Sequence, residues 1–228
     1  MQLIETSSLG VRSAWFRFAS RDSGWSVTLY PMIHVGEPAF YDAVYRAAAA
    51  HDVVLVEGIR SPVARHLTRV YRWSARRFGL VVQPPFRAHE GPRIVHADLS
   101  AREFELEWKR IPLWIRAAAF LMSPLAALAL RWSGTRESLA AAAQLEDRKS
   151  AREILSWNPA LGALHRTILD VRDARLLERL AAILAEPGDE GRSVAIVYGA
   201  EHMRAVLKEM RRRGFHAVDS GWFDIFDL

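Results

Sequence analysis

The chain has 228 residues, half of them hydrophobic, which is enough for a sizeable core and suits a single domain over residues 1–228. Cysteine is absent, so disulfides, thiolate zinc sites and cysteine nucleophiles are excluded, and any bound metal must be held by His, Asp or Glu. The formal net charge is +5, and nearly all of the cations are arginines, which is compatible with an anionic partner. No secretory pattern opens the chain, so we expect a cytoplasmic protein.

The first elements are predicted between residues 11 and 60. Alternating apolar residues over 11–29 predict a β-hairpin that turns near residues 21–24. Gly36 then allows a sharp exit from the second strand, and Pro38 suits the start of a helix, because a proline at the first helical position loses no hydrogen bond. Residues 53–56 are continuously apolar, which indicates a strand buried on both faces, as in a parallel sheet.

A helix is predicted over residues 62–78, with apolar side chains on one face. The opposite face carries a stripe of four arginines, Arg65, Arg69, Arg72 and Arg76. Nucleic acid or an acidic lipid surface could bind this stripe, but any solvated amphipathic helix has the same pattern, and we favour this simpler interpretation. Short strands at 80–82 and 93–96 follow. Ser100 and Glu103 then form a capping box, which marks the start of another helix.

Residues 111–130 form an apolar run of twenty residues with one charge, Arg116. Its length matches a membrane span, but Pro112, Pro124 and Arg116 oppose that interpretation, and the uncharged part is too short to cross a bilayer. Because Ser123 and Pro124 suit the cap and first turn of a new helix, we predict two short helices here. A buried helical pair or a homodimer face is favoured over contact with a membrane surface, and a true span is least favoured.

The last part of the chain is predicted to be helical at 136–157 and, capped by Asn158, at 159–186. A strand at 193–198, a turn at 199–202 and an amphipathic helix follow, and then a strand at 215–218 and an aromatic tail that packs on the sheet. We therefore predict an α/β (α+β) fold with a central mixed β-sheet, flanking helices and a helical insertion at about 100–186 in the middle of the chain.

Four polar residues fall where an apolar strand gives way to a turn or a helix: His34, Glu57, Asp98 and His202. In an open α/β sheet the ends of these strands lie at one edge, where ligands usually bind. A lone histidine at such a place is more often structural, and Asp98 is as readily a turn residue. Two histidines at equivalent places, together with Glu57, favour a shared site.

The chain resembles the TraB/GumN (Tiki-like) family, within the wider erythromycin-esterase/ChaN-like fold group, in its first and last strand-turn-helix units. That family has two G-x-x-H motifs and a glutamate at the end of the strand that follows the first. The second motif is intact as Gly199 to His202, and Glu57 matches the glutamate. In the first motif His34 is in place but Pro31 occupies the glycine position.

Asp98 is similar to an aspartate that the family carries after a middle strand, although Leu99 stands where an arginine is expected. The resemblance covers about a third of the chain. It implies a mixed sheet with a helical insertion and a hydrolase site for a divalent metal.

Two imidazoles with one or two carboxylates suit Mn, Co, Zn or Fe, and such a metal can generate hydroxide from bound water. We assign His34 and His202 as metal ligands, Glu57 as a ligand or general base, and Asp98 as a second ligand or the group that orients a histidine. Glu201 is a further catalytic candidate. Glu201 and Glu37 also have a simpler interpretation as carboxylates at helix starts.

Two classes of function stay open. The first is a metal-dependent hydrolase of a peptide bond or another ester or amide, acting on a small-molecule or peptide substrate. The second is a non-catalytic regulatory or binding protein of the same fold, which dimerises or touches a membrane through residues 111–130 and binds an acidic partner through the arginine stripe. Nucleic acid is not favoured as that partner. Nucleotide-binding and serine-elbow motifs are absent.

Overall fold

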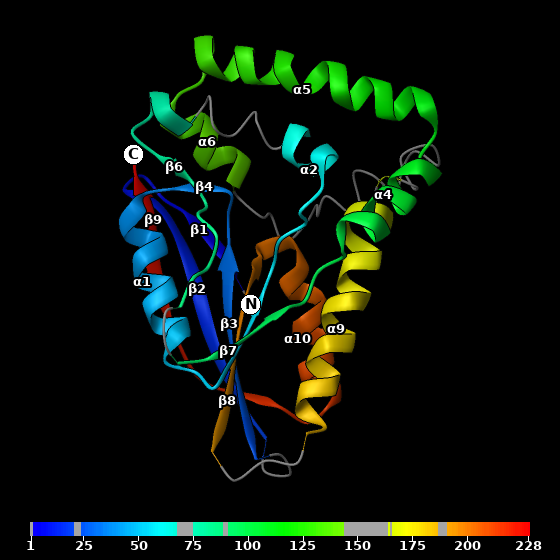
Figure 1. Cartoon of the computed structure of the whole chain (residues 1–228). Helices are drawn as coiled ribbons and strands as arrows, with labels where there is room; N and C mark the ends of the chain where they lie inside the picture. Colours follow the sequence, from blue (N-terminus) through cyan, green and yellow to red (C-terminus); the bar gives the residue numbers. More distant parts are fainter. Residues whose placement is uncertain are drawn as a thin grey trace.

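A central β-sheet is flanked by helices on both sides (Figure 1). The computed structural model describes residues 2–20, 24–67, 75–88, 91–143, 164, 166–186 and 191–228. Helix α1 (Pro38–Ala49) covers one side of the sheet, and α9 (Val171–Leu184) and α10 (Met203–Arg212) cover the other. The predicted α/β fold with a mixed sheet is confirmed.

Four neighbouring strands of the sheet are parallel: β3 (Trp25–Met32), β8 (Arg192–Gly199), β5 (Val53–Val56) and β7 (Arg93–His96), in that order. On the other side of β3, the pairing is antiparallel, with β2 (Gly10–Ala19), which also pairs with β1 (Ile4–Thr6) and β9 (His216–Asp227). Strands β2 and β3 form the hairpin predicted over residues 11–29. All of β5 is buried, as its continuous apolar character predicts.

Helix α1 begins at Pro38, as predicted, and buries Phe40, Tyr41, Val44 and Ala48. It is preceded by β4 (Val35–Gly36), which pairs with β6 (Val81–Val82) in a small second sheet. Gly36 lies close to β9, because a Cβ atom built on it would stand 2.9 Å from Cγ2 of Ile225. The glycine thus lets the turn after β3 pass against the last strand.

The helix predicted over residues 62–78 is present at its start as α2 (Pro62–Leu67). Residues 68–74 lie outside the described residues, so the arginine stripe is described only at its ends, where Arg65 and Arg76 are exposed. Helix α4 (Ala101–Arg110) carries the predicted capping box, in which the Ser100 hydroxyl accepts a hydrogen bond from the Glu103 backbone and the Glu103 carboxylate accepts one from the Ser100 backbone.

The prediction of two short helices over residues 111–130 was wrong, because a single helix, α5 (Leu113–Ser133), runs through Pro124. Ser123 does not cap a new helix. Its hydroxyl donates a hydrogen bond to the Leu67 carbonyl at 3.2 Å, which ties α5 to α2. Buried Ile115 and partly buried Phe120 anchor the first half of α5 in an apolar cluster with Trp108. Among the described residues, no helix combines the length and the apolar character needed to cross a membrane.

The remaining elements are α6 (Arg136–Ala143), the π-helix η1 (Arg166–Asp170) and the 3-10 helix η2 (Ala200–His202). The predicted helices at 136–157 and 159–186 are seen only in part, because residues 144–163 lie outside the described part of the chain. The aromatic tail is not a separate segment: residues 216–227 form one strand, β9, whose Ile225 and Phe226 are buried.

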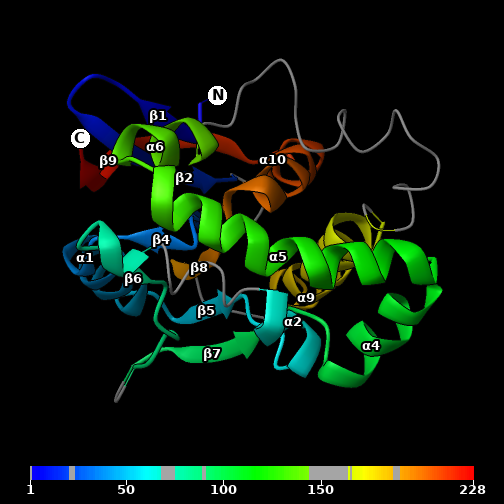
Figure 2. The same ribbon diagram turned by 90° about the horizontal axis from the view of Figure 1, so that it is seen from above.

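Two apolar clusters stabilise the described structure. The larger one lines the sheet and joins it to α1, α9 and α10. The smaller one consists of Leu99, Phe104, Trp108, Ile111 and Ile115, and lies between α4, α2 and the first half of α5. Seen from above, α5 runs across the end of the molecule at which the parallel strands end, past β8 and toward α9 and α4, while β5 and β7 lie to one side of it, next to α2 (Figure 2). The second cluster thus holds a helix at the end of the molecule at which the predicted site residues lie.

Candidate functional site

The four parallel strands end at one edge of the sheet, and the predicted site residues follow them directly. Glu57 comes immediately after β5, Asp98 two residues after β7, and His202 closes η2, which continues from β8. His34 comes two residues after β3 and is exposed. The predicted residues therefore follow the strands at one edge of the sheet, as expected. Their contacts, however, involve a residue that the sequence analysis did not identify.

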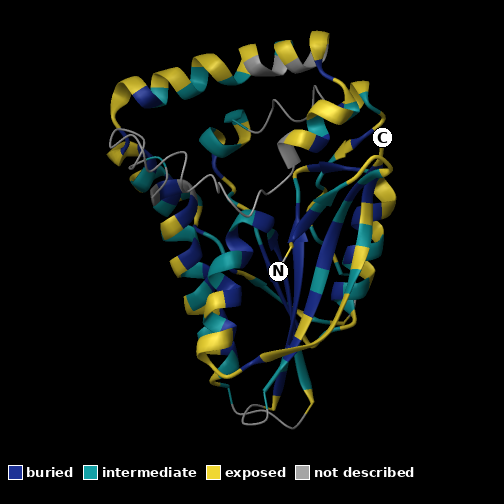
Figure 3. Ribbon diagram, turned by 180° about the vertical axis from the view of Figure 1, so that it is seen from behind, coloured by how far each residue is buried: buried dark blue, intermediate teal, exposed yellow. Residues whose placement is uncertain are grey.

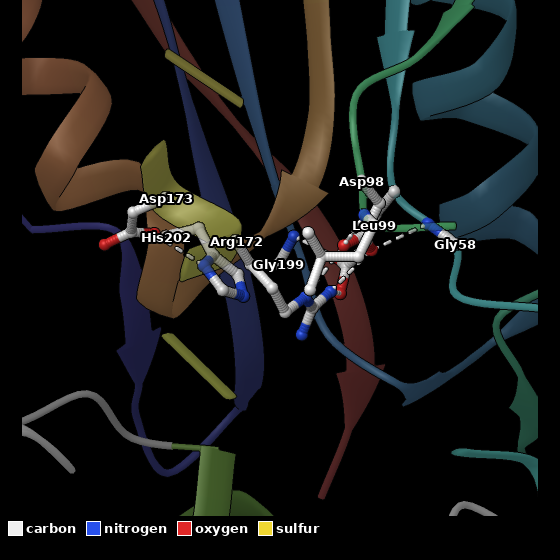
Figure 4. A network of polar contacts seen from close by, with 8 residues as sticks. Gly58, Asp98, Leu99, Arg172, Asp173, Gly199 and His202 are labelled. Atoms are coloured by element: carbon white, nitrogen blue, oxygen red, sulfur yellow. Dashed lines mark hydrogen bonds and ion pairs between the residues drawn. The ribbon is translucent and has the colours of Figure 1, made fainter. Parts of the chain in front are cut away.

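That residue is Arg172, at the start of α9, whose guanidinium binds both Glu57 and Asp98. Figure 4 shows Arg172 beside Asp98. Its Nη2 donates to Oε1 of Glu57 at 2.5 Å and to Oδ2 of Asp98 at 2.8 Å, and its Nε donates to Oδ1 of Asp98 at 3.0 Å. The side chains of Arg172 and Glu57 are only 11% and 12% exposed. Two carboxylates and one guanidinium therefore form a buried, charge-assisted network.

Asp98 is the most enclosed member of this network, with a side chain that is 1% exposed. Besides Arg172, it accepts hydrogen bonds from the backbone N–H groups of Leu99, at 2.8 Å, and Gly58, at 3.2 Å. Both carboxylate oxygens are thus engaged. Asp98 fixes the turn after β7 to the turn after β5, which makes it a structural centre of this edge.

Glu57 is held from two directions. The backbone N–H of Gly199 donates to its Oε2 at 2.6 Å, while Arg172 binds Oε1. Burial alone would raise the pKa of Glu57, but the positive charges of Arg172, His202 and His34 outweigh burial and lower this pKa to about 2. Glu57 is therefore ionised at neutral pH, and both histidines lie near enough to act on its charge.

Gly199 stands where a larger residue would press against Glu57. A Cβ atom built on Gly199 would stand 3.0 Å from Oε2 of Glu57 and 3.4 Å from Cδ2 of His202. Its φ angle of −52° is one that any residue adopts, so the requirement is for space rather than for backbone freedom. The missing side chain allows the carboxylate to reach the backbone N–H.

His202 forms the second part of the site. It is buried, and its Nδ1 lies 2.7 Å from Oδ1 of Asp173, which is also buried (Figure 4). The ring of Tyr198 packs edge-on against the imidazole, with 4.9 Å between ring centroids. With the carboxylate accepting a hydrogen bond from Nδ1–H, the neutral imidazole keeps its lone pair on Nε2, where it can accept a proton or bind a metal.

Arg172 and Asp173 were missed because both lie in the helical insertion, for which no motif was available. One signal was present for Asp173. Its spacing from Leu176, Leu180 and Ile183 puts it on the same face of α9, and this face is buried. The sequence thus has a carboxylate on a helix face that is otherwise apolar. Such a carboxylate needs a buried partner, and His202 is that partner.

Three other predicted residues have different surroundings. Glu37 precedes α1 and forms an ion pair with Arg136 at 3.5 Å. Glu201 is half-buried in η2, directly before His202 in the chain. Pro31 lies inside β3, where its carbonyl accepts a hydrogen bond from the Ser13 hydroxyl at 2.7 Å, so proline fits the glycine position of the first motif without disturbing the strand.

The predicted metal ligands fit a metal only in part. Within the described ranges, no group of three or more His, Asp or Glu residues is arranged to hold a metal ion. Each carboxylate oxygen of Glu57 and Asp98 already accepts a hydrogen bond, most of them from the cation Arg172. The imidazoles of His34 and His202 remain suitable ligands by their chemistry. The metal therefore stays a prediction that rests on the two histidines.

Fold and site together define an α/β protein with a mixed sheet and a polar centre at the carboxyl edge of its parallel strands. Comparisons with protein-family models, curated proteins and solved structures found no match to this chain. The resemblance to the TraB/GumN family therefore stays a prediction, carried by the motif residues at the two ends of the chain.

Proposed function

We propose that the protein is a hydrolase of esters or amides, including peptide bonds, which acts at the carboxyl edge of its parallel strands. The observation that carries this proposal is the buried pair of His202 and Asp173, at 2.7 Å, beside an ionised Glu57. A histidine that is oriented by a carboxylate is a common proton acceptor in hydrolysis.

In the proposed reaction, Nε2 of His202 accepts a proton from a water molecule as the water oxygen attacks the substrate carbonyl. Asp173 holds the imidazole in the required tautomer and stabilises the imidazolium that forms. The bond to the alcohol or amine then breaks, and His202 returns the proton to the leaving group. The products are a carboxylic acid and an alcohol or amine.

Arg172 and Glu57 act as positioning residues in this proposal. The guanidinium cancels part of the carboxylate charge, and the N–H of Gly199 fixes Glu57 beside the histidine motif. This leaves one net negative charge on Glu57, Asp98 and Arg172 together, which favours a positive charge on His202 during proton transfer. A divalent metal on His34 and His202 would supply Lewis-acid chemistry at the same place, but no step here depends on it.

The first test measures hydrolysis of chromogenic esters and amides by the wild type and by His202→Ala. We expect the variant to lose at least about a hundredfold in kcat, because it lacks the proton acceptor. Asp173→Asn should lose activity to a smaller extent. His216→Ala, which changes an exposed histidine on β9, is the matched control and should keep wild-type activity.

Circular dichroism checks that each variant is folded. Equal activity of His202→Ala and wild type would contradict the proposal, as would a wild type that hydrolyses none of the substrates with or without added Mn, Co, Zn or Fe. Elemental analysis of the same samples tests the metal prediction separately: bound metal in the wild type that is lost in His202→Ala would support it.

A further inference from the structure

Helix α5 presents an apolar stripe to solvent along its whole length. Four large side chains repeat at positions i, i+7, i+11 and i+18, which puts them on one face of a helix. They are Trp114, Leu121, Leu125 and Trp132, with exposed fractions of 60%, 68%, 55% and 74%. At about 1.5 Å per residue, the stripe is about 27 Å long.

The opposite face of α5 is the one that packs on the protein. Ile115 is buried, and Ala119 and Phe120 are packed against the second apolar cluster. Seen from behind, the outer face of α5 is exposed at the end of the molecule, and nothing in the described part of the chain covers it (Figure 3). The apolar residues on the outer face of α5 therefore do not contribute to the core, and an exposed apolar patch of this kind is typical of an interaction surface.

The charged residues within the segment that carries this stripe are all cations, and two of them are paired with acidic residues outside the segment: Arg110 with Glu107, at 2.6 Å, and Arg136 with Glu37, at 3.5 Å. Residues 108–136 contain no acidic residue, but they contain five cations: Lys109, Arg110, Arg116, Arg131 and Arg136. Lys109 and Arg110, just before α5, are both exposed. A second copy of the same helix would bring cations against cations, whereas an anionic surface would be attracted.

The stripe also begins and ends with tryptophan. Indole rings favour the boundary between lipid headgroups and acyl chains, because one part of the ring is apolar and the N–H remains hydrated. An interfacial helix lies in the plane of the membrane with its apolar face in that boundary and its cations near the headgroups.

We propose that α5 docks the protein on an anionic lipid surface, with Trp114, Leu121, Leu125 and Trp132 inserted among the headgroups and the exposed cations Lys109 and Arg110 near lipid phosphates. This inference rests on the exposed face of α5 and is independent of the hydrolase proposal. Because α5 lies at the end of the molecule where the parallel strands end, docking turns that end toward the lipid surface (Figures 1 and 2).

The test is co-sedimentation of the full chain with vesicles of phosphatidylcholine, with and without phosphatidylglycerol. We expect binding to the anionic vesicles that weakens steeply as salt is added. Leu121→Gln/Leu125→Gln should reduce the partition coefficient about tenfold or more, because it removes two inserted leucines. Both side chains are exposed, so the variant should fold normally.

The matched control is Leu9→Gln/Val218→Gln, which removes two exposed apolar side chains that do not belong to α5, one just before β2 and one in β9, and should bind as the wild type does. A second measurement follows tryptophan fluorescence: vesicles should shift the emission of the wild type to shorter wavelength, and this shift should shrink in Trp114→Phe/Trp132→Phe.

Three results would overturn the proposal. The first is equal vesicle binding by the wild type and the α5 variant. The second is equal binding to neutral and anionic vesicles. The third is a wild-type dimer that ignores vesicles and dissociates in Leu121→Gln/Leu125→Gln, which sedimentation velocity would detect and which would assign the stripe to a second copy of the chain.

Discussion

Arg172 is the residue on which the site depends most. It is the cation that compensates Glu57 and Asp98, and burial of two carboxylates without it would be costly. Its pKa is well above its ordinary value: burial works against the charged form, but Glu57 and Asp98 outweigh burial. Arg172 is therefore a permanent cation that holds the turns after β5 and β7 against the start of α9.

Arg172→Met should lower the free energy of unfolding by about 3–5 kcal/mol, because it leaves buried carboxylate charge without a partner. Urea unfolding followed by circular dichroism measures this change. Arg211→Met, which alters an exposed arginine in α10, should change stability by no more than about 0.5 kcal/mol. Adding Glu57→Gln to Arg172→Met should restore part of the loss. A loss no greater than that of Arg211→Met would show that the network contributes little.

Glu57 predicts how stability depends on pH. Its pKa is about 2 in the folded protein, against an ordinary value of 4.5, so the folded state binds this proton less readily than the unfolded state does. The stabilisation is therefore fully present above about pH 4.5 and is lost as pH falls toward 2, by an amount on the order of 3 kcal/mol.

This pH dependence is tested by denaturant unfolding of the wild type and Glu57→Gln from about pH 5 to about pH 2. Because glutamine cannot ionise, the stability of the variant should fall less steeply with pH than that of the wild type. If the free energy of unfolding fell equally with pH in both proteins, other carboxylates would account for the loss of stability in acid.

At the residue scale, the sequence placed Glu57, Asp98 and His202 at strand ends correctly, because a strand that changes abruptly into a polar turn is a local signal. It did not reveal Arg172. Arginines are frequent throughout this chain, and only the packing of α9 against the sheet distinguishes this one from those on solvated faces.

At the scale of elements, α5 shows how tertiary contacts override a local helix-breaking signal. Pro124 has no N–H for the bond to the preceding turn, yet the helix continues, because α5 is anchored on α4 and α2 at Ile115, Phe120 and Ser123. The error over residues 111–130 arose from reading Ser123 and Pro124 as a cap, when the serine hydroxyl instead bonds Leu67.

Pro124→Ala distinguishes the two arrangements. In a continuous helix the alanine restores a backbone hydrogen bond at an exposed position, which stabilises the folded state. Alanine also makes the unfolded chain more flexible, which favours unfolding by a smaller amount. The free energy of unfolding should therefore rise by about 1–2 kcal/mol in total. Thermal unfolding measures the change. Pro85→Ala, at an exposed loop position, should give no such gain. A lower melting temperature for Pro124→Ala would instead indicate that residue 124 starts a separate helix.

At the scale of the whole molecule, the parallel part of the sheet could be predicted because each strand-turn-helix unit carries its own periodicity. The pairing of β9 with β2 and the position of β8 between β3 and β5 could not, because these contacts join segments far apart in the chain and depend on complementary shape. The second apolar cluster was missed for the same reason, since it combines α2, α4 and α5.

The position of β8 has a consequence for synthesis. Asp52 and Ser193, which hydrogen-bond at the start of β5 and β8, are 141 residues apart. On a ribosome, β3 and β5 therefore emerge on the order of ten seconds before β8, the strand that lies between them. During this time the edges of β3 and β5 that pair with β8 have no partner strand. A nascent chain stopped before Gly199 has the carboxylate of Glu57 but not the N–H that holds it, so both the sheet and its polar edge are completed only near the end of translation.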